Sequence, residues 1–233
     1  LRARIIPCLL LKNGSLVKTT RFEAPKYVGD PLNTVRIFNE KEVDELIVAD
    51  IDATVNETPP DFDLIEKLAV ECRMPLCYSG GVTTVQQVER IIGLGVEKVA
   101  MGCAAMLNPK LINQAATRVG SQSIVVVMDV KKDHVSKKYE VFTHNGTKPT
   151  GIDPLDFALL SASLGAGELL INSIDNDGML CGYDTEVMLK IRASTKLPVT
   201  LLGGASGIDD CSKLIRRFGE IGAAAGSMFV FKG

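Results

Sequence analysis

The chain has 233 residues, of which 46% are apolar, and its formal net charge is −2. This composition suffices for one large core, and the near-neutral charge without a long basic run argues against nucleic-acid binding. No apolar stretch reaches about 18 residues and no cleavable leader opens the chain, so we expect a cytoplasmic protein that does not enter a membrane.

Short apolar runs alternate with helical patterns along the chain. The runs are apolar almost throughout, as expected of parallel strands covered on both faces. The predicted strands are Ile5–Leu10, Glu45–Asp50, Leu76–Ser79, Lys98–Met101, Ile124–Asp129, Leu169–Ser173, Val199–Leu202 and Ala223–Gly226. The predicted helices are Pro31–Asn39, Asp61–Cys72, Thr84–Leu94, Asn108–Val119, Asp153–Leu164, Asp184–Ser194 and Gly207–Arg217.

Two segments depart from this alternation. Lys131–Lys148 is long and polar, and Tyr139–Phe142 followed by Asn145-Gly146 predicts a β-hairpin inserted after the fifth strand. The sequence stops at Gly233, soon after the eighth strand, so we expect the eighth outer helix to be missing or altered.

The second half of the chain repeats the first. The matched segments are Glu45–Val48 with Glu168–Ile171, Ile51-Asp52 with Ile174-Asp175, and Gly80-Gly81 with Gly203-Gly204, each 123 residues apart. Two equivalent sets of βα units predict a closed (βα)8 TIM barrel. We expect a single domain over residues 1–233, with half-barrels at about 1–120 and 121–233.

Polar residues follow several strands, at the end of the barrel where active sites lie. Asp129 ends an apolar strand, which should hold its carboxylate rigidly at the mouth for acid–base chemistry. A helix cap, or a hairpin partner of Lys131 or Lys148, is the alternative. Other candidates at this end are Lys18, Asp50, Asp52, Ser173, Asp175 and Asp177.

Glycines precede several predicted helices, where exposed N–H groups attract phosphate. They occur as Gly80-Gly81, Gly203-Gly204, Gly102-Cys103 and Gly226-Ser227. Their symmetric positions suggest a small molecule with a phosphate at each end, spanning the mouth. Tight turns without a ligand are the alternative.

Four charged residues open strands at the opposite end, where they should point into the barrel: Arg4, Glu45, Lys98 and Glu168. They can form a closed ring of ion pairs, and by physics alone a stabilising plug is the favoured interpretation. The six cysteines show no metal-ligand spacing, so we expect reduced buried thiols and neither a metal nor a cofactor. His134 and His144 are expected to be solvated loop residues.

The chain resembles the HisF family, the cyclase subunits of imidazole glycerol phosphate synthase. The resemblance lies in Ile5–Leu9, Gly29–Pro31, Gly120–Gln122, Gly165–Glu168 and Gly182–Asp184, and covers essentially the whole chain. It implies a two-fold-repeat (βα)8 barrel. It also implies that a separate glutaminase subunit (HisH-like) supplies ammonia, which is added to a bisphosphorylated intermediate of histidine synthesis.

The resemblance also implies residue roles. Asp129 matches a catalytic aspartate, Lys18 a lysine at the substrate phosphate, and Asp50 and Asp177 further substrate contacts. We therefore expect Asp129 and Lys18 to be the catalytic residues. The charged ring matches the gate of the ammonia path under the glutaminase. At the twin of Asp129, however, Leu10 replaces the partner aspartate of the family, and a leucine cannot transfer a proton. Further departures are Ser79, Gly102-Cys103 and Asn172. We therefore expect a poor histidine-pathway cyclase.

Other segments resemble an acetamidino-sugar modification branch of the family, from bacterial surface-polysaccharide gene clusters. They are Pro7–Gly14, Lys26–Pro31, Met74–Tyr78 and Thr143–Lys148. This resemblance implies a glutaminase and a sugar amidotransferase as partners. The leading hypothesis is thus an ammonia-delivering barrel for acetamidino-sugar synthesis. An authentic imidazole glycerol phosphate synthase cyclase subunit is the alternative, and a scaffold that only binds ligand is the third hypothesis.

Overall fold

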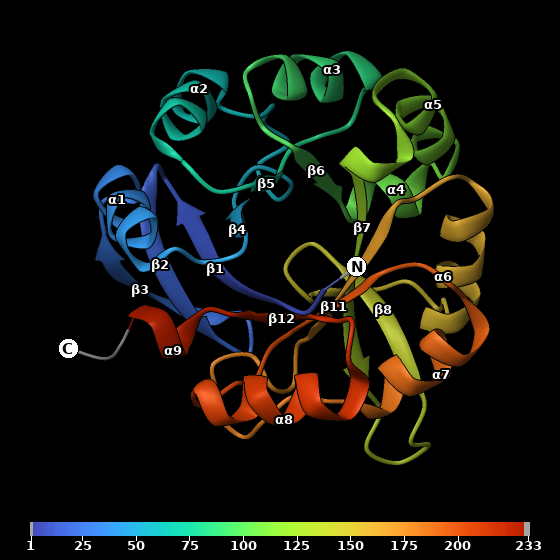
Figure 1. The fold of residues 1–233 in the computed structure, drawn as a ribbon. Coiled ribbons are helices and arrows are strands. Elements are labelled where there is room, and N and C mark those ends of the chain that lie inside the picture. Colours follow the sequence, from blue (N-terminus) through green and yellow to red (C-terminus); the bar gives the residue numbers. More distant parts are fainter. Residues whose placement is uncertain (1, 231–233) are drawn as a thin grey trace.

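The computed structural model describes residues 2–230, and these residues form a closed barrel surrounded by helices (Figure 1). Strand β1 pairs with β12 on one side and with β4 on the other, and β7 pairs with β10, so the ring of barrel strands is closed. Within the described residues the eight parallel barrel strands are β1 (Arg4–Lys12), β4 (Leu46–Asp50), β5 (Leu76–Ser79), β6 (Lys98–Met101), β7 (Ile124–Lys132), β10 (Glu168–Ser173), β11 (Val199–Leu202) and β12 (Gly222–Ala225). The predicted (βα)8 barrel and its strands are confirmed.

The outer helices begin where side chains cap them. Asp30, Asp61 and Asp153 each accept a hydrogen bond from a backbone N–H of the first turn, and Thr84 forms a capping box with Gln87. The helices are α1 (Pro31–Lys41), α2 (Phe62–Glu71), α3 (Val85–Gly93), α5 (Lys110–Val119), α6 (Pro154–Ser163), α7 (Glu186–Ser194) and α8 (Ile208–Phe218). All the predicted helices are confirmed, within two residues at either end.

Three short helical segments were not predicted: α4 (Cys103–Leu107), the 3₁₀ turn η1 (Ser121–Ser123) and α9 (Ser227–Val230). The last is the only helix that the described residues contain after β12, and Phe229 on it packs edge-to-face against Phe38 of α1. One short helix therefore follows the eighth strand, as far as residue 230. Phe231–Gly233 lie outside the described residues.

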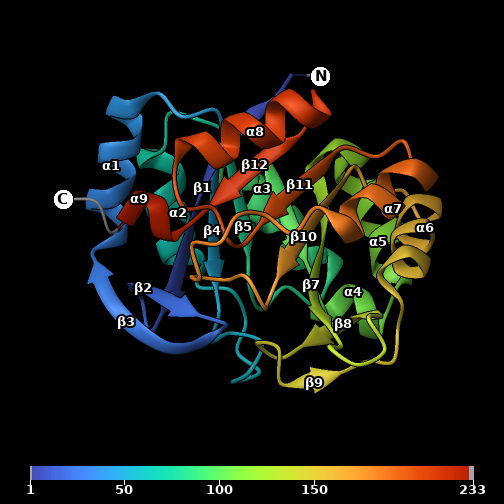
Figure 2. The same cartoon turned by 90° about the horizontal axis from the view of Figure 1, so that it is seen from below.

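Two hairpins extend from the barrel at the end opposite to the N-terminus (Figure 2). The predicted one is confirmed: β7 pairs antiparallel with β8 (Tyr139–Thr143), which pairs with β9 (Lys148–Pro149). The other, β1 with β2 (Ser15–Thr20) and β3 (Glu23–Gly29), was missed. Asn13-Gly14, with positive φ at both residues, was the turn signal that could have revealed it.

The repeat extends to the register of the strands. Leu10 pairs with Ala49 across β1 and β4, and Asp129 pairs with Asn172 across β7 and β10. Both pairs lie at the same level of the barrel, because the loop bonds that follow are also equivalent: Ile51 N–H donates to the carbonyl of Leu11, and Ile174 N–H to that of Val130. Leu10 is thus the structural twin of Asp129.

Two separate apolar clusters hold the barrel together. The larger lies between strands and helices and includes Leu9, Val35 and Ile65. The smaller fills the barrel interior with Ile6, Cys8, Ile47, Cys77, Ala100, Val125, Leu170 and Ala224, and Leu10, Val127 and Leu202 pack against it toward the mouth. Within residues 2–230, no helix has the length and apolar character that crossing a bilayer requires.

Candidate active site at the barrel mouth

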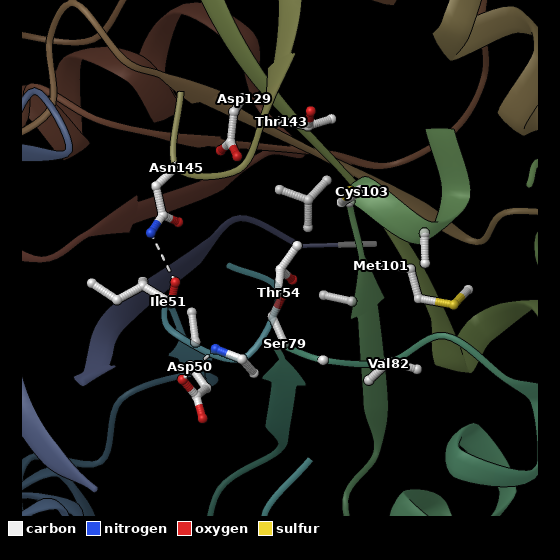
Figure 3. Close-up of a pocket in the computed structure, with 18 of the residues that line it drawn as sticks. Asp50, Ile51, Thr54, Ser79, Val82, Met101, Cys103, Asp129, Thr143 and Asn145 are labelled. Carbon is white, nitrogen blue, oxygen red and sulfur yellow. Dashed lines mark hydrogen bonds between the residues drawn. The ribbon is translucent and has the colours of Figure 1, made fainter. Parts of the chain in front are cut away.

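A cavity of about 500 Å³ occupies the mouth of the barrel. Its walls come from the carboxyl ends of β4, β5, β6 and β7, from the loop that follows β4, and from the tip of the β8 hairpin. Figure 3 shows Asp129 on one side of this cavity and Asp50 on the opposite side. Two of the predicted acidic residues therefore line one cavity.

Asp129 is the carboxylate best placed for proton transfer. It ends the apolar part of β7, lines the cavity, and accepts a 2.9 Å hydrogen bond from Nδ2 of Asn172. Burial raises the pKa of Asp129 to about 7, although the bond from Asn172 acts to lower it, and the charge of Asp177 adds to the rise. A group that ionises near neutral pH can both take and give a proton under working conditions.

Asn172 has one amide atom without a partner. Its Oδ1 is the one buried side-chain polar atom of residues 2–230 that no hydrogen bond satisfies. A buried acceptor without a donor is costly, and its side chain lines the cavity. A ligand with an N–H or O–H group would satisfy it.

Replacing Asn172 with leucine should raise the pKa of Asp129 further above its usual value. The substitution removes the hydrogen bond that favours the charged carboxylate and adds apolar surface beside it. The carboxyl carbon shift of Asp129, followed by NMR against pH, measures this. An unchanged or lower pKa in Asn172→Leu would show that the bond does not stabilise the carboxylate. Asn172→Gln, which keeps the amide, is the control.

The first half of the mouth lacks the matching polar pair. Leu10 and Ala49 stand where the second half has Asp129 and Asn172, and both line the cavity with Ile47. Leu10, which replaces the aspartate of the family, therefore changes the wall of the cavity. At the level of these two pairs, the second half of the mouth carries a carboxylate and an amide, whereas the first half carries two apolar side chains.

Asp50 is engaged locally. Its Oδ1 accepts hydrogen bonds from the backbone N–H groups of Asp52 and Ala53, which fixes the turn after β4. Burial raises the pKa of Asp50, and these two bonds counteract the rise. The residue lines the cavity, so its predicted contact with substrate stays a prediction.

The paired glycines approach neighbouring strands closely. Both glycines of each pair have a positive φ. A Cβ on Gly80 would lie 2.5 Å from the carbonyl oxygen of Asp50. A Cβ on Gly203 would lie 2.7 Å from the carbonyl oxygen of Ser173, which is the equivalent contact. This close packing alone is enough to require glycine at these positions, without any ligand. Phosphate binding at Gly80-Gly81 and Gly203-Gly204 stays a prediction.

Lys18 and Asp177 lie beside a second, smaller cavity with Gly203, Gly204, Gly226 and Ser227. Lys18 Nζ is 3.0 Å from Oδ1 of Asp177, and both side chains are buried. Asp177 Oδ2 also accepts bonds from Thr19 and from the N–H of Phe22. Asp177 thus positions Lys18 and the β2 hairpin.

Lys18 and Asp129 were both predicted to be catalytic, but they do not line the same cavity. Lys18 lines the small cavity and Asp129 the large one. The two cavities share Leu10 and Asn172 among their lining residues, so they are adjacent parts of one mouth. A long ligand could contact both groups.

Gly102 and Cys103 open α4 at the cavity, and Cys103 meets a histidine that the sequence did not place there. Cys103 Sγ is 3.9 Å from Nδ1 of His144, and both residues line the cavity. His144 lies in the turn of the hairpin, as expected, but it is half-buried because the hairpin folds over the mouth; His134 is exposed. Burial raises the pKa of the Cys103 thiol. In the described chain, no three His, Cys, Asp or Glu side chains are placed to share a metal ion.

At the opposite end of the barrel the four charges form the expected ring. Arg4 contacts Glu45 at 2.5 Å and Glu168 at 2.7 Å, and Lys98 Nζ lies 2.8 Å from a carboxylate oxygen of each. Thr200 adds a hydroxyl bond to Glu168 at 2.5 Å. Burial acts to raise the pKa of Glu168, but the bonds and charges of Arg4 and Lys98 outweigh it and hold the pKa below its usual value.

The chain matches known proteins over its whole length. The family described as "Histidine biosynthesis protein" matches residues 4–233. A Vibrio vulnificus protein named "Putative imidazole glycerol phosphate synthase subunit hisF3" is 54% identical over all of this chain and 90% of its own length. A Pseudomonas aeruginosa protein whose name ends in "hisF2" is 47% identical over all of this chain and 92% of its own length. "Imidazole glycerol phosphate synthase subunit HisF" of Natranaerobius thermophilus is 38% identical over the same shares.

Proposed function

The chain belongs to the histidine biosynthesis protein family, as a HisF-like synthase subunit, and on this premise we propose that it brings ammonia to an acceptor at its barrel mouth. The observation that carries the proposal is the carboxylate of Asp129, whose pKa burial raises to about 7 and which lines a cavity of about 500 Å³. A nitrogen that attacks an electrophilic carbon must lose a proton, and Asp129 is the group that takes it.

The proposed source of ammonia is a glutaminase subunit of the HisH kind, docked at the base of the barrel. The ring of Arg4, Glu45, Lys98 and Glu168 closes that end, and the interior above it is lined by small and apolar side chains such as Cys77 and Ala100. Neutral ammonia can cross an apolar interior at lower cost than an ion can. We propose that the ring is the gate of this path.

The acceptor that we favour is a sugar in acetamidino-group synthesis, with a sugar amidotransferase as a further partner. The observation in favour is the apolar wall of Leu10 and Ala49, which removes one of the two acid–base sides of the mouth. A conduit that passes ammonia on, or adds it to a different carbon, does not need both carboxylates. The glycine pairs would hold phosphate groups of the acceptor.

The second candidate acceptor is the bisphosphorylated intermediate of histidine synthesis, which would make the chain an imidazole glycerol phosphate synthase cyclase subunit. The raised pKa of Asp129 favours it, because one group near neutrality can serve as both acid and base. The name of the Natranaerobius relative also favours it. The two candidates differ in what Leu10 does to turnover.

Turnover of the histidine-pathway bisphosphate at saturating ammonium decides between them. We expect the wild-type chain to bind this compound without converting it, and Leu10→Asp to gain turnover, because the new carboxylate faces Asp129 from the twin position. Leu10→Asn is the control, because asparagine has the size of aspartate but cannot take a proton. Conversion by the wild-type chain at a rate that Leu10→Asp does not exceed would establish the cyclase instead.

Partnership is tested separately, by adding the chain to a HisH-type glutaminase. The proposal requires a complex and faster glutamine hydrolysis. If no complex and no faster hydrolysis are found when ligands for the mouth are present, the delivery of ammonia through this barrel is refuted.

A further inference from the structure

His144 lies in the main cavity, although its sequence suggested a solvated loop. The antiparallel pairing of β7 with β8 returns the chain to the mouth, where Asp129 pairs with Phe142. His144 follows two residues later, is half-buried, and lines the same cavity as Asp129. The hairpin therefore adds an imidazole to the wall of the mouth.

The hairpin tip is held in place by its neighbours. His144, Asn145 and Gly146 have φ of 51°, 54° and 73°, a conformation that non-glycine residues adopt at a cost. Asn145 Nδ2 donates a 2.8 Å hydrogen bond to the carbonyl of Ile51, across the mouth (Figure 3). Thr147 Oγ1 donates to the carbonyl of His144 at 2.6 Å. The position of the imidazole is thus fixed by bonds on both sides.

One nitrogen of the ring is engaged and the other is not. Nδ1 of His144 lies 3.1 Å from Oγ1 of Thr143 and 3.9 Å from Sγ of Cys103. No residue in 2–230 forms a hydrogen bond to Nε2. A histidine whose first nitrogen is oriented by a hydrogen bond presents the second for proton exchange with a ligand.

The other titratable groups of the cavity are less suited to this task. Asp50 is bound to two backbone N–H groups, and burial raises the pKa of the thiols of Cys8 and Cys103. Glu57 lies on an exposed loop. With Leu10 on the first strand, His144 is the remaining partner for Asp129.

We propose that His144 is a second proton-transfer group of the mouth, which acts with Asp129 in place of the carboxylate that Leu10 cannot supply. The inference rests on the proposed function, the addition of ammonia. Ammonia adds to the carbonyl carbon while Asp129 takes one proton from the nitrogen and Nε2 of His144 gives one to the oxygen, which yields a carbinolamine. Asp129 then releases its proton to solvent and His144 regains one. As the C–O bond breaks and the C=N bond forms, the nitrogen gives a second proton to Asp129, and the oxygen takes a second proton from Nε2 and leaves as water. No oxidant or reductant is required. Because the imidazole comes from the hairpin, the acceptor is approached from a different side than a strand-one carboxylate would allow.

The first test follows the ring nitrogens of the full chain by ¹⁵N NMR, with the histidine-pathway bisphosphate as the probe. The chain has two histidines, so His134→Gln and His144→Gln assign the signals. Saturating probe should move the Nε2 signal of His144 and leave that of His134 unchanged. An Nε2 signal that does not move when calorimetry shows the cavity to be filled would overturn the proposal, because a purely structural histidine behaves in this way.

The second test measures ammonium-driven turnover of the bisphosphate and of the N-acetyl sugar, with the sugar amidotransferase present for the latter. His144→Gln should lower whichever rate is found by about 10²-fold or more, and imidazole in the medium should restore part of the rate of His144→Ala. His134→Gln is the matched control with unchanged rate. An undiminished rate in His144→Gln would overturn the inference alone. No turnover in any chain, with no glutaminase stimulation, would overturn the proposed function and this inference with it.

Discussion

Turnover with ammonium is expected to fall by about 10²- to 10⁴-fold when Asp129 is replaced by asparagine. The substitution keeps the size of the side chain and its contact with Asn172, but removes the group that takes the proton from nitrogen. The rate of the wild-type chain should rise with pH toward about 7, where the carboxylate becomes charged, and then level off. The rate profile of Asp129→Asn should lack this rise. The assay uses whichever acceptor the wild-type chain converts, the bisphosphate or the N-acetyl sugar with its amidotransferase.

Unfolding experiments separate lost chemistry from lost structure in this variant. The folded state raises the pKa of Asp129 from 3.8 to about 7, so it favours the neutral acid. The contribution of Asp129 to the free energy of unfolding is therefore fully present below about pH 4 and is lost as the pH rises through about 7. Asp129→Asn should therefore match the wild type at pH 4. At pH 8 it should be more stable by about 1–2 kcal/mol, once the shift is discounted for the solvent in the cavity. Full turnover, or a variant that is unfolded at pH 8, would contradict this account.

The second large effect is expected at the base of the barrel, where Glu168→Ala should lower the free energy of unfolding by about 3–5 kcal/mol. Glu168 is buried and accepts bonds from Arg4, Lys98 and Thr200. Its removal leaves two cations with one carboxylate, that of Glu45, in a closed space. Urea unfolding at pH 7 measures the change, and Glu168→Gln should cost less because it keeps an acceptor.

The pH dependence and a surface control make this prediction specific. The pKa of Glu168 is lowered in the folded state, so its stabilisation is present above the unfolded value of about 4.3 and disappears as the pH falls through the folded value. The difference in the free energy of unfolding between Glu168→Ala and the wild type should therefore be smaller at pH 3 than at pH 7. Glu89, paired with Arg118 on the surface, is the matched control: Glu89→Ala should cost at most about 1 kcal/mol. If Glu168→Ala and Glu89→Ala lose the same free energy of unfolding, the burial of the ring does not strengthen its ion pairs.

Local patterns in the sequence determined the architecture. Apolar runs bounded by turn residues located the barrel strands to within two or three residues, because strand and helix periodicities are properties of short segments. Helix starts followed from capping residues such as Asp61 for the same reason. The internal repeat predicted that the barrel closes. The strand starts placed Arg4, Glu45, Lys98 and Glu168 at one end, since residues that open parallel strands must meet there.

The candidate site depended on contacts between distant segments. The sequence placed Asp129 at the mouth and marked Leu10 as its twin, but it gave no pKa for Asp129 and did not show that Asn172 contacts it. It grouped Lys18 with Asp129 as catalytic, whereas Lys18 pairs with Asp177 beside the smaller, adjacent cavity. These features depend on burial and on side-chain direction, which no local pattern encodes.

The hairpin at His144 marks the boundary between the two kinds of information. Tyr139–Phe142 and Asn145-Gly146 were enough to predict a hairpin, because strand propensity and turn geometry are local. Where its tip would rest was decided by a bond from Asn145 to Ile51, 94 residues away in the chain. The sequence by itself thus determined the barrel and its charged base, while the tertiary structure alone decided which groups share the mouth, because that depends on long-range packing.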